Sequence, residues 1–323
     1  MNLVESKLFF TTPPLSIKQF NQQKNLNLVR QDLDKATLYI IGKRETPVIH
    51  VIDCSPLVEY VKDYDNEFVL LNISMPESGF NTEAVYILPK TIKKAEFISS
   101  IASITIEQIL CCVAHNVGAF GCLDDISPLI TYEVLYVGQC VGEPLTKRFK
   151  AHHALQNMLI EEKVIFRKYD KADELILMPF FLDSQTLSVL TPENIERDFM
   201  KAFTNDFDFG AREVNLDAEK ALVHNMNPRY NKIRFLNYPK SDDGLYNSDA
   251  HAFSYSINEF ILLKYQDGVV VGCPDNQYAS KIVGDNEGFT KVYGPGEDIT
   301  KRYVGKIMSY MGEDAVRRFY ENQ

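Results

Sequence analysis

The sequence predicts an α+β fold built from three consecutive parts, and three observations indicate this. Residues 1–115 contain alternating apolar runs with helical segments between them, residues 116–240 join two strands to amphipathic helices, and residues 241–323 contain a hairpin signal. A chain of 323 residues is long for one compact domain, and its 45% hydrophobic content suffices for buried cores. We therefore expect domains at 1–115, 116–240 and 241–323.

The first part has the pattern of an α/β or α+β domain. Four short runs rich in branched and aromatic residues predict strands at 37–41, 48–52, 68–73 and 84–88. Helical spacing predicts helices near 55–61 and across 105–115. This part contains no chemical motif, so we expect a docking or regulatory role.

The middle part begins with a strand and a helix that carry polar side chains. Residues 133–139 are rich in Val, Leu and Tyr and predict a strand, which Gly138 and Gly142 turn into a loop. Thr146 then opens a helix on which Arg148 and His152 lie one turn apart on the same face. A continuous apolar run at 174–182 predicts a buried strand, and Thr191 with Pro192 starts a helix at 195–203.

A second polar helix ends the middle part. Ala218, Leu222 and Met226 repeat at steps of four and predict one apolar face, and Pro228 ends the helix. Glu219 lies on this helix and Asn231 follows it. A carboxylate supplies the oxygen ligand that magnesium requires, and an amide can orient a phosphate or a neighbouring group. Taken alone, such a glutamate is more typical of a solvated helix face than of a metal site.

The last part is predicted to be a β-rich extension. Apolar runs at 260–265 and 269–271 flank Gln266-Asp267-Gly268, which is typical of a hairpin. Gly294-Pro295-Gly296 predicts a turn, and residues 299–311 predict a final helix.

The residues of the middle part resemble the GIY-YIG nuclease family. Tyr136-Val137-Gly138 resembles the second motif of the family, and Arg148 with His152 resembles its arginine helix. Residues 219–231 are similar to the glutamate-to-asparagine segment in the nuclease half of the incision subunit of bacterial nucleotide excision repair. Five residues lie at the same distance in sequence from Glu219 as their counterparts do from the glutamate of that segment. They are Leu222, Val223, Pro228, Tyr230 and Asn231. The resemblance covers roughly residues 115–240.

This resemblance implies a small antiparallel sheet with flanking helices and an Mg²⁺- or Mn²⁺-dependent endonuclease. In the family a tyrosine helps to deprotonate water, an arginine clamps the phosphate and one glutamate holds a divalent ion, as phosphodiester hydrolysis requires. The implied catalytic residues are Tyr136, Arg148, His152, Glu219 and Asn231, with Glu219 as the metal ligand. The implied substrate-binding residues are Gly138, Lys147, Lys150, Arg229 and Lys232.

The chain departs from the family at the first motif, Gly-Ile-Tyr. The nearest candidate, Gly118-Ala119-Phe120, has no hydroxyl group. Tyr132 shares a strand face with Tyr136 but lies about 13 Å away along the strand. Gln139 occupies the position where the family often has lysine. Either the base has been relocated or the site is catalytically weakened.

The distribution of basic and acidic residues along the chain indicates which partners, DNA or protein, it can bind. The net charge is −10, and residues 131–240 carry 15 basic and 16 acidic residues, against 11 and 15 before them and 8 and 13 after them. This balance does not favour non-specific DNA binding. Two local basic clusters, around Lys147–Lys150 and around Arg229–Arg234, are equally compatible with a DNA-binding patch and with a solvated face. The acidic flanks are compatible with protein partners.

Composition also indicates the compartment. The six cysteines form no regular framework, which favours a reducing environment, and neither a signal peptide nor an apolar run of membrane-spanning length is present. We therefore expect a cytoplasmic protein with no membrane contact.

Three hypotheses follow. The chain is a metal-dependent endonuclease of DNA restriction, repair or anti-phage defence, a catalytically inactive docking module with the same fold, or a structural subunit of an assembly. Joint occurrence of Arg148, His152, Glu219 and Asn231 favours the first, and the absent first tyrosine favours the others.

Overall fold

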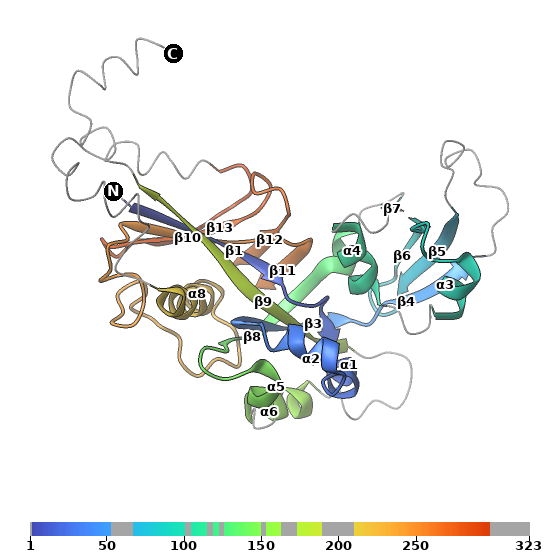
Figure 1. Cartoon of the computed structure of the whole chain (residues 1–323), viewed down its shortest axis with the longest axis horizontal. Helices are drawn as coiled ribbons and strands as arrows, with labels where there is room; N and C mark the ends of the chain where they lie inside the picture. The colour runs from blue at the N-terminus through green and yellow to red at the C-terminus, as the bar shows by residue number, and fades with distance from the viewer. Residues whose placement is uncertain are drawn as a thin grey trace, which may run out of the picture.

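Two β-sheets form the framework of the fold, which is mixed α/β (Figure 1). The computed structural model describes residues 2–52, 67–100, 105–114, 119–122, 126–149, 153–162, 173–188 and 210–297. The larger sheet is mixed and ten-stranded, whereas the smaller one is antiparallel and four-stranded.

The larger sheet is assembled from strands that lie far apart in the sequence. Parallel pairing joins β1 to β10 and β8 to β11, and the other pairs are antiparallel. In spatial order the strands are β12 (Gly268–Gly272), β11 (Ile261–Tyr265), β8 (Thr131–Gln139), β3 (Leu38–Glu45), β9 (Asp173–Ser188), β1 (Asn2–Phe10), β10 (Ala252–Ile257), β13 (Lys281–Asp285) and β14 (Thr290–Tyr293), with β2 (Leu15–Ser16) paired to β9.

This sheet crosses both domain boundaries that the sequence suggests. Strands from 1–115, from 116–240 and from 241–323 are hydrogen-bonded neighbours in it, so the divisions at 115/116 and 240/241 both cut through one sheet. The physical reason is that composition reports local properties, whereas strand pairing joins residues of any sequence separation.

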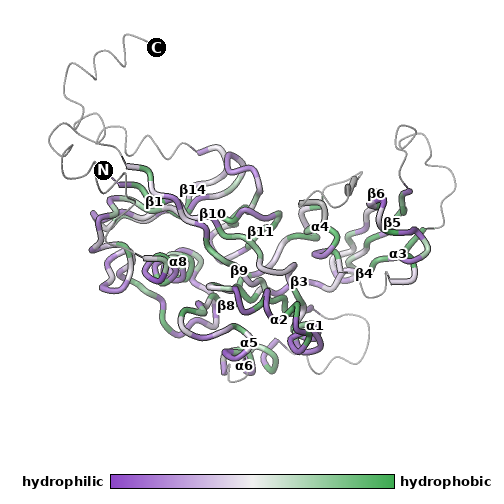
Figure 2. The backbone as a smooth tube through the Cα atoms, viewed as in Figure 1, coloured by the Kyte–Doolittle hydropathy of each residue, from purple (hydrophilic) through white to green (hydrophobic). Residues whose placement is uncertain are grey.

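Helices cover both faces of the larger sheet. Alternate residues of β3 enter different cores, with Leu38 and Ile40 in one and Tyr39 and Ile41 in the other. Helix α8 (Ala211–Met226) packs on the first face. Four helices cover the second face: α1 (Ile17–Gln23), α2 (Asn27–Leu33), α5 (Leu145–Arg148) and α6 (His153–Glu161). In Figure 2 the hydrophobic colour follows strands such as β5 and β8, which are rich in buried side chains.

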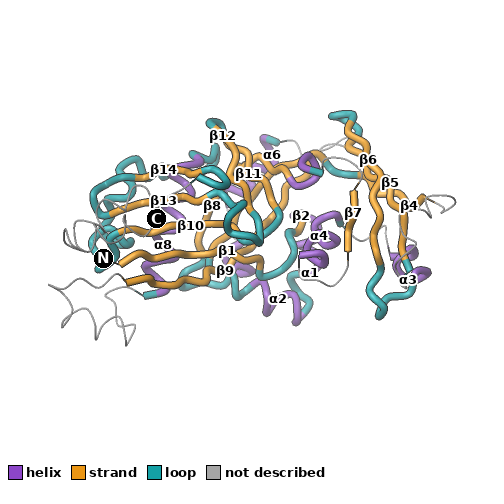
Figure 3. Tube along the Cα trace, turned by 90° about the horizontal axis from the view of Figure 1, so that it is seen from above, coloured by secondary structure: helices purple, strands orange, loops and turns teal. Residues whose placement is uncertain are grey.

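The smaller sheet forms a separate lobe, inserted between β3 and β8. Its strands are β4 (Val48–Ile52), β5 (Phe68–Met75), β6 (Phe80–Ile87) and β7 (Ala119–Cys122), in that spatial order. Helices α3 (Lys94–Ser100) and α4 (Ile106–Ala114) share its core through Phe97 and Ile109. Figure 3 shows this lobe beside the larger sheet.

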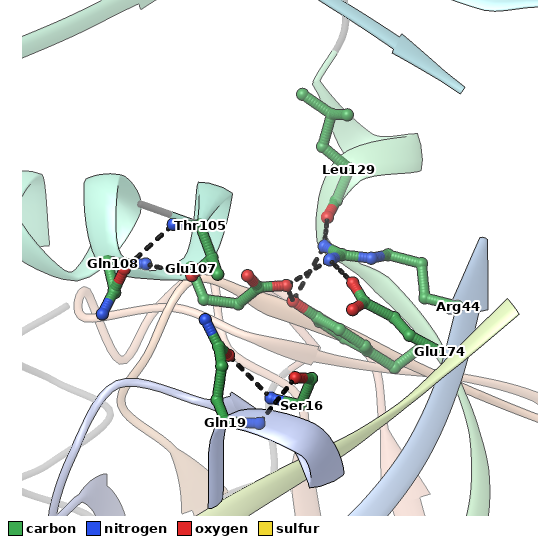
Figure 4. Close-up of polar contacts among 9 residues, drawn as sticks. Ser16, Gln19, Arg44, Thr105, Glu107, Gln108, Leu129 and Glu174 are labelled. Atoms are coloured by element: carbon green, nitrogen blue, oxygen red, sulfur yellow. Dashed lines mark hydrogen bonds and ion pairs between the residues drawn. The ribbon is translucent and has the colours of Figure 1, made fainter. Parts of the chain in front are cut away.

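Arg44 joins the two lobes. Its guanidinium, from β3, lies between the carboxylates of Glu107 on α4 and Glu174 on β9, and it also bonds the carbonyl of Leu129 (Figure 4). Tyr132 donates to Glu107 at 3.0 Å. Arg44 and Glu107 are buried, each 4% exposed, whereas the side chain of Glu174 is partly buried at 23% exposed.

Several predicted elements are confirmed. The four strands expected in the first part are β3 to β6, the helix expected at 105–115 is α4, and the expected hairpin is β11–β12. The strand expected at 174–182 is part of β9. Strands β1, β10, β13 and β14 were not anticipated from the sequence. The helices expected at 55–61, 195–203 and 299–311 lie outside the described residues.

None of the helices in the described part of the chain has the length and apolar character needed to cross a bilayer.

Candidate active site at the free edge of strand β8

The candidate site lies along the edge of strand β8 beyond the point where its pairing with β11 ends. Strand β11 pairs only with residues 131–133 of β8, so the rest of this edge needs other hydrogen-bond partners. Tyr230 donates its main-chain N–H to the carbonyl of Leu135 at 3.0 Å. Further along, the carboxylate of Glu219 accepts a hydrogen bond from the main chain of Gln139.

Asn231 fills the gap between these two contacts. Its Oδ1 accepts from the N–H of Val137 at 2.9 Å, and its Nδ2 donates to the carbonyl of the same residue at 2.7 Å. Asn231 is 7% exposed, and both ends of its amide are used in these bonds. This side chain therefore positions β8 through Val137, and it also lines the cleft described below.

Helix α8 brings Glu219 to this edge, and a fixed turn follows it. The helix ends at Met226, as predicted, and Asn227 caps it in the left-handed conformation with φ 47°. Arg234 then donates to the side chain of Asn227 at 2.7 Å and to the carbonyl of Pro228. These bonds hold the segment 227–234 against the helix end, so Asn231 returns to β8.

A buried carboxylate anchors the helix from its other side. Asp217 is fully buried and accepts hydrogen bonds from Tyr238 at 2.9 Å, Tyr255 at 2.7 Å and the N–H of Leu245 at 3.0 Å. Because Asp217 and Glu219 are two residues apart on α8, this anchor helps to set the position of Glu219.

Two tyrosines from adjacent strands meet beside the free edge. Tyr39 of β3 and Tyr136 of β8 have ring centroids 5.9 Å apart. Their hydroxyls are hydrogen-bonded, and Arg148 also bonds the Tyr39 hydroxyl. Since a guanidinium can only donate, the Tyr39 oxygen accepts the hydrogen bond from Arg148. The Tyr39 hydroxyl then donates its own proton to the oxygen of Tyr136. Gly138 makes this approach possible, because a Cβ there would lie 2.6 Å from the Tyr39 hydroxyl.

Tyr39 is the residue that sequence reasoning missed. It lies in a strand that was predicted, but 136 − 39 = 97 residues before Tyr136, because the smaller lobe is inserted between the two strands. The nearest sequence match to the first motif lies elsewhere, since Ala119 and Phe120 belong to β7 of the smaller sheet and Gly118 lies outside the described residues. Tyr132 is buried against Arg44 and Glu107, away from the free edge.

A cleft of about 580 Å³ opens beside these residues. Its walls contain five of the sequence-derived site residues, namely Tyr136, Arg148, Glu219, Asn231 and Lys232. The other lining residues are Gln139, Glu143, His153, Tyr230, Ile233 and Phe235.

The remaining sequence-derived residues lie elsewhere. Lys147 is exposed on α5 and forms an ion pair with Glu143 at 3.5 Å. Arg229 points away from the cleft toward Glu161 and Glu162. Gly138 lies under the Tyr39 ring. Neither Lys150 nor His152 is among the described residues.

Burial dominates the electrostatics of the site. It raises the pKa of Glu219 to about 7, against the opposing effects of Arg148 and of the Gln139 hydrogen bond. Burial also raises the pKa of Tyr39 and of Tyr136, and for Tyr136 the charge of Glu219 adds to this. Both tyrosines are therefore protonated near neutral pH and act as hydrogen-bonding groups. The thiol of Cys140 has its pKa raised by burial to about 12, so it is not a nucleophile.

The donor set fits a magnesium ion that keeps most of its water. Within the described residues no three His, Cys, Asp or Glu side chains converge as a metal cage. Magnesium is commonly bound by one or two carboxylates and several waters. Glu219, which lines the cleft together with Glu143, is a carboxylate of the kind such an ion needs.

Comparison with protein-family models, with curated proteins and with solved structures finds no match to this chain.

Proposed function

We propose that this protein is a divalent-metal-dependent endonuclease of the GIY-YIG type that hydrolyses phosphodiester bonds in DNA. One observation carries the proposal: Tyr136, Arg148 and Glu219, which lie on separate elements, line one cleft, and Tyr39 is hydrogen-bonded to two of them. A role in restriction, repair or anti-phage defence belongs to the same proposal.

Each side chain has a role that its surroundings support. Arg148 is directed to the cleft and its planar guanidinium suits a phosphate. Glu219 would hold Mg²⁺ or Mn²⁺, and the ion would supply positive charge to the scissile phosphate. The pair Tyr39 and Tyr136 orients the attacking water by hydrogen bonding, since burial keeps both hydroxyls protonated. Asn231 and Asp217 are positioning residues.

The test measures strand cleavage by the purified chain. Wild-type protein with Mg²⁺ or Mn²⁺ is expected to convert supercoiled plasmid DNA to nicked or linear forms, and Glu219→Gln and Arg148→Ala to abolish this. Glu83→Gln is the matched control, because it removes the same charge from an exposed position in the smaller lobe. Folded wild-type protein that cuts neither DNA nor RNA with any divalent ion would contradict the proposal.

Metal binding gives a second readout that does not depend on cleavage. Because the pKa of Glu219 is about 7, protons compete with the cation near neutral pH. Mn²⁺ affinity, measured by calorimetry, is expected to rise as pH increases from 6 through about 8 and to lose this dependence in Glu219→Gln.

One observation favours a second candidate, a catalytically inactive docking module. Burial raises the pKa of both tyrosines, and Gln139 occupies the position where the family often has lysine, so the cleft lacks an evident base. Such a module would bind nucleic acid through Arg148 and Lys232 without cutting it. DNA binding that Arg148→Ala weakens, in the absence of any cleavage, would favour this candidate over the first.

A further inference from the structure

A second, larger cleft lies between the two lobes. Its volume is about 940 Å³. The larger sheet contributes Lys43 and Lys264, the segment after α8 contributes Arg229 and Arg234, and the smaller lobe contributes Ser78. Hydrogen bonds hold the two lobes together at this cleft. The Glu45 carboxylate of the larger sheet accepts one from the main chain of Glu77 and one from that of Ser78, the latter at 2.9 Å.

Basic side chains outnumber acidic ones along the lining of this cleft. Five basic residues line it, against two acidic ones, Glu45 and Glu133, although the whole chain has a net charge of −10. The basic residues are Lys43, Arg44, Arg229, Arg234 and Lys264. A local positive potential of this kind attracts polyanions even when the net charge is negative.

The five basic residues of the cleft differ in whether a described carboxylate pairs with them. Lys43 and Arg229 both pair with Glu162, at 3.0 and 3.2 Å, and Arg44 pairs with buried carboxylates. In the described part of the chain, Arg234 and Lys264 form no ion pair with a carboxylate. Arg234 donates only to uncharged oxygens, and Lys264 is exposed on β11. Among the described residues that line the cleft, these two cations and the carboxylates of Glu45 and Glu133 are therefore the charged groups outside ion pairs.

The cleft shares a wall with the candidate active site. Along the segment 229–235, Arg229 and Arg234 face the interlobe cleft, whereas Tyr230, Lys232 and Phe235 face the site. A single extended ligand can therefore contact both sides of this segment. Hydroxyl and amide groups of Ser78, Ser127 and Gln266 add neutral donors of the type that bind phosphate oxygens.

We propose that the interlobe cleft binds the sugar-phosphate backbone of the nucleic acid that flanks the bond to be cut. The inference rests on the proposed function for the position of that bond. Lys264 and Arg234 contact phosphates without reading sequence, and the smaller lobe forms the opposite wall. The insertion between the two tyrosine strands thereby becomes part of the substrate-binding surface.

The test measures binding separately from cleavage. Binding of a fluorescent DNA duplex in EDTA is followed by anisotropy for wild type, Lys264→Glu and Lys264→Gln. We expect Lys264→Glu to weaken binding at least about fivefold and Lys264→Gln to weaken it less, and each to reduce the slope of log affinity against log salt by about 1. Lys18→Glu is the matched control, because Lys18 is exposed on α1 and lines neither cleft. A thermal melt checks that each variant is folded.

The outcomes separate the two proposals. Equal affinity for Lys264→Glu and Lys18→Glu overturns the cleft assignment, even when wild type cuts DNA. If Lys264→Glu loses DNA binding but the wild-type protein does not cut DNA, the result supports DNA binding in the interlobe cleft and contradicts the proposed nuclease activity. A mononucleotide that displaces the duplex at lower concentration than unlabelled duplex does would identify a small-ligand pocket and overturn the inference.

Discussion

The amide of Asn231 replaces a neighbouring strand for Val137. It supplies one acceptor and one donor to the main chain of that residue, at 2.9 and 2.7 Å, as a paired strand would. This contact fixes the part of β8 that carries Tyr136 and Gly138, and it fixes the loop that carries Lys232. The geometry of the cleft depends on it.

Replacement of Asn231 by alanine is expected to destabilise the fold by about 1–3 kcal/mol, because two buried main-chain groups of Val137 lose their partners. Chemical denaturation measures this loss. Asn231→Asp keeps the acceptor and removes the donor, so it is expected to fall between alanine and wild type. If Asn231→Ala lowered cleavage while leaving the free energy of unfolding unchanged, the residue would act on the substrate and not through β8.

Tyr39→Phe and Tyr132→Phe are expected to have opposite effects. Loss of the Tyr39 hydroxyl removes its contacts to Tyr136 and Arg148, so cleavage should fall by about 10-fold or more with little change in stability. Loss of the Tyr132 hydroxyl removes one of the buried donors to Glu107, which keeps its ion pair with Arg44, and should cost about 1–3 kcal/mol with cleavage retained. Plasmid cleavage and urea denaturation of both variants provide the comparison. The reverse pattern would assign the first tyrosine to position 132.

The ionisation of Glu219 is expected to make the fold less stable as pH rises. Its folded pKa is raised to about 7 from an ordinary value of 4.5, so the folded state holds the proton more tightly than the unfolded state does. Stability from this group is present below about pH 4.5 and is lost as pH rises to about 7. Glu219→Gln should therefore match wild type near pH 4 and exceed its unfolding free energy by about 1–3 kcal/mol at pH 8. Equal stability of the two proteins at pH 8 would contradict this.

Glu259 provides an independent case of the same effect. Burial raises its pKa to about 7, against a hydrogen bond of 2.9 Å from the N–H of Phe10. Glu259→Gln keeps an oxygen for that bond and removes the charge, so the pH dependence of stability between about 4.5 and 7 should become shallower. Thermal melts across this pH range measure it. Because Glu259 does not line the cleft of Glu219, cleavage is expected to continue, and loss of cleavage would show that the two regions are coupled.

Arg44→Met is expected to lower the free energy of unfolding more than the single substitutions above do. It leaves the buried carboxylate of Glu107 and the partly buried carboxylate of Glu174 without their cation, which costs about 3–5 kcal/mol. The triple variant Arg44→Met, Glu107→Gln, Glu174→Gln should recover much of that loss, because it removes the charges together. Urea denaturation compares the two. A triple variant no more stable than Arg44→Met would show that packing around Arg44, and not charge, dominates.

The sequence predicted the parts of the site that are close together along the chain. Glu219, Pro228 and Asn231 lie within 13 residues, and helical periodicity with a proline stop was enough to predict their local structure. Tyr39 could not be found in this way. Its strand was predicted, but its pairing with β8 spans an inserted lobe, and a local pattern contains no information on such a partner.

The same limit explains the domain boundaries. Strand β1 has alternating burial along residues 3–8, yet the sequence alone does not reveal that its partners are β9 and β10. The role of Asn231 was missed for a different reason. An amide next to a site can orient a ligand or bond the main chain, and only the position of Val137 decides between these.

The central position of β1 also determines when the larger sheet can be completed during synthesis. Leu3 pairs with Ala252, so 252 − 3 = 249 residues of chain separate two strands that lie side by side. At about 5–20 residues per second, a ribosome needs roughly 10–50 s to cover that interval. During this time the apolar side chains of β1, such as Val4 and Leu8, lack their final partners and are open to chaperones or to aggregation. The smaller lobe, whose strands pair within residues 48–122, can fold well before then.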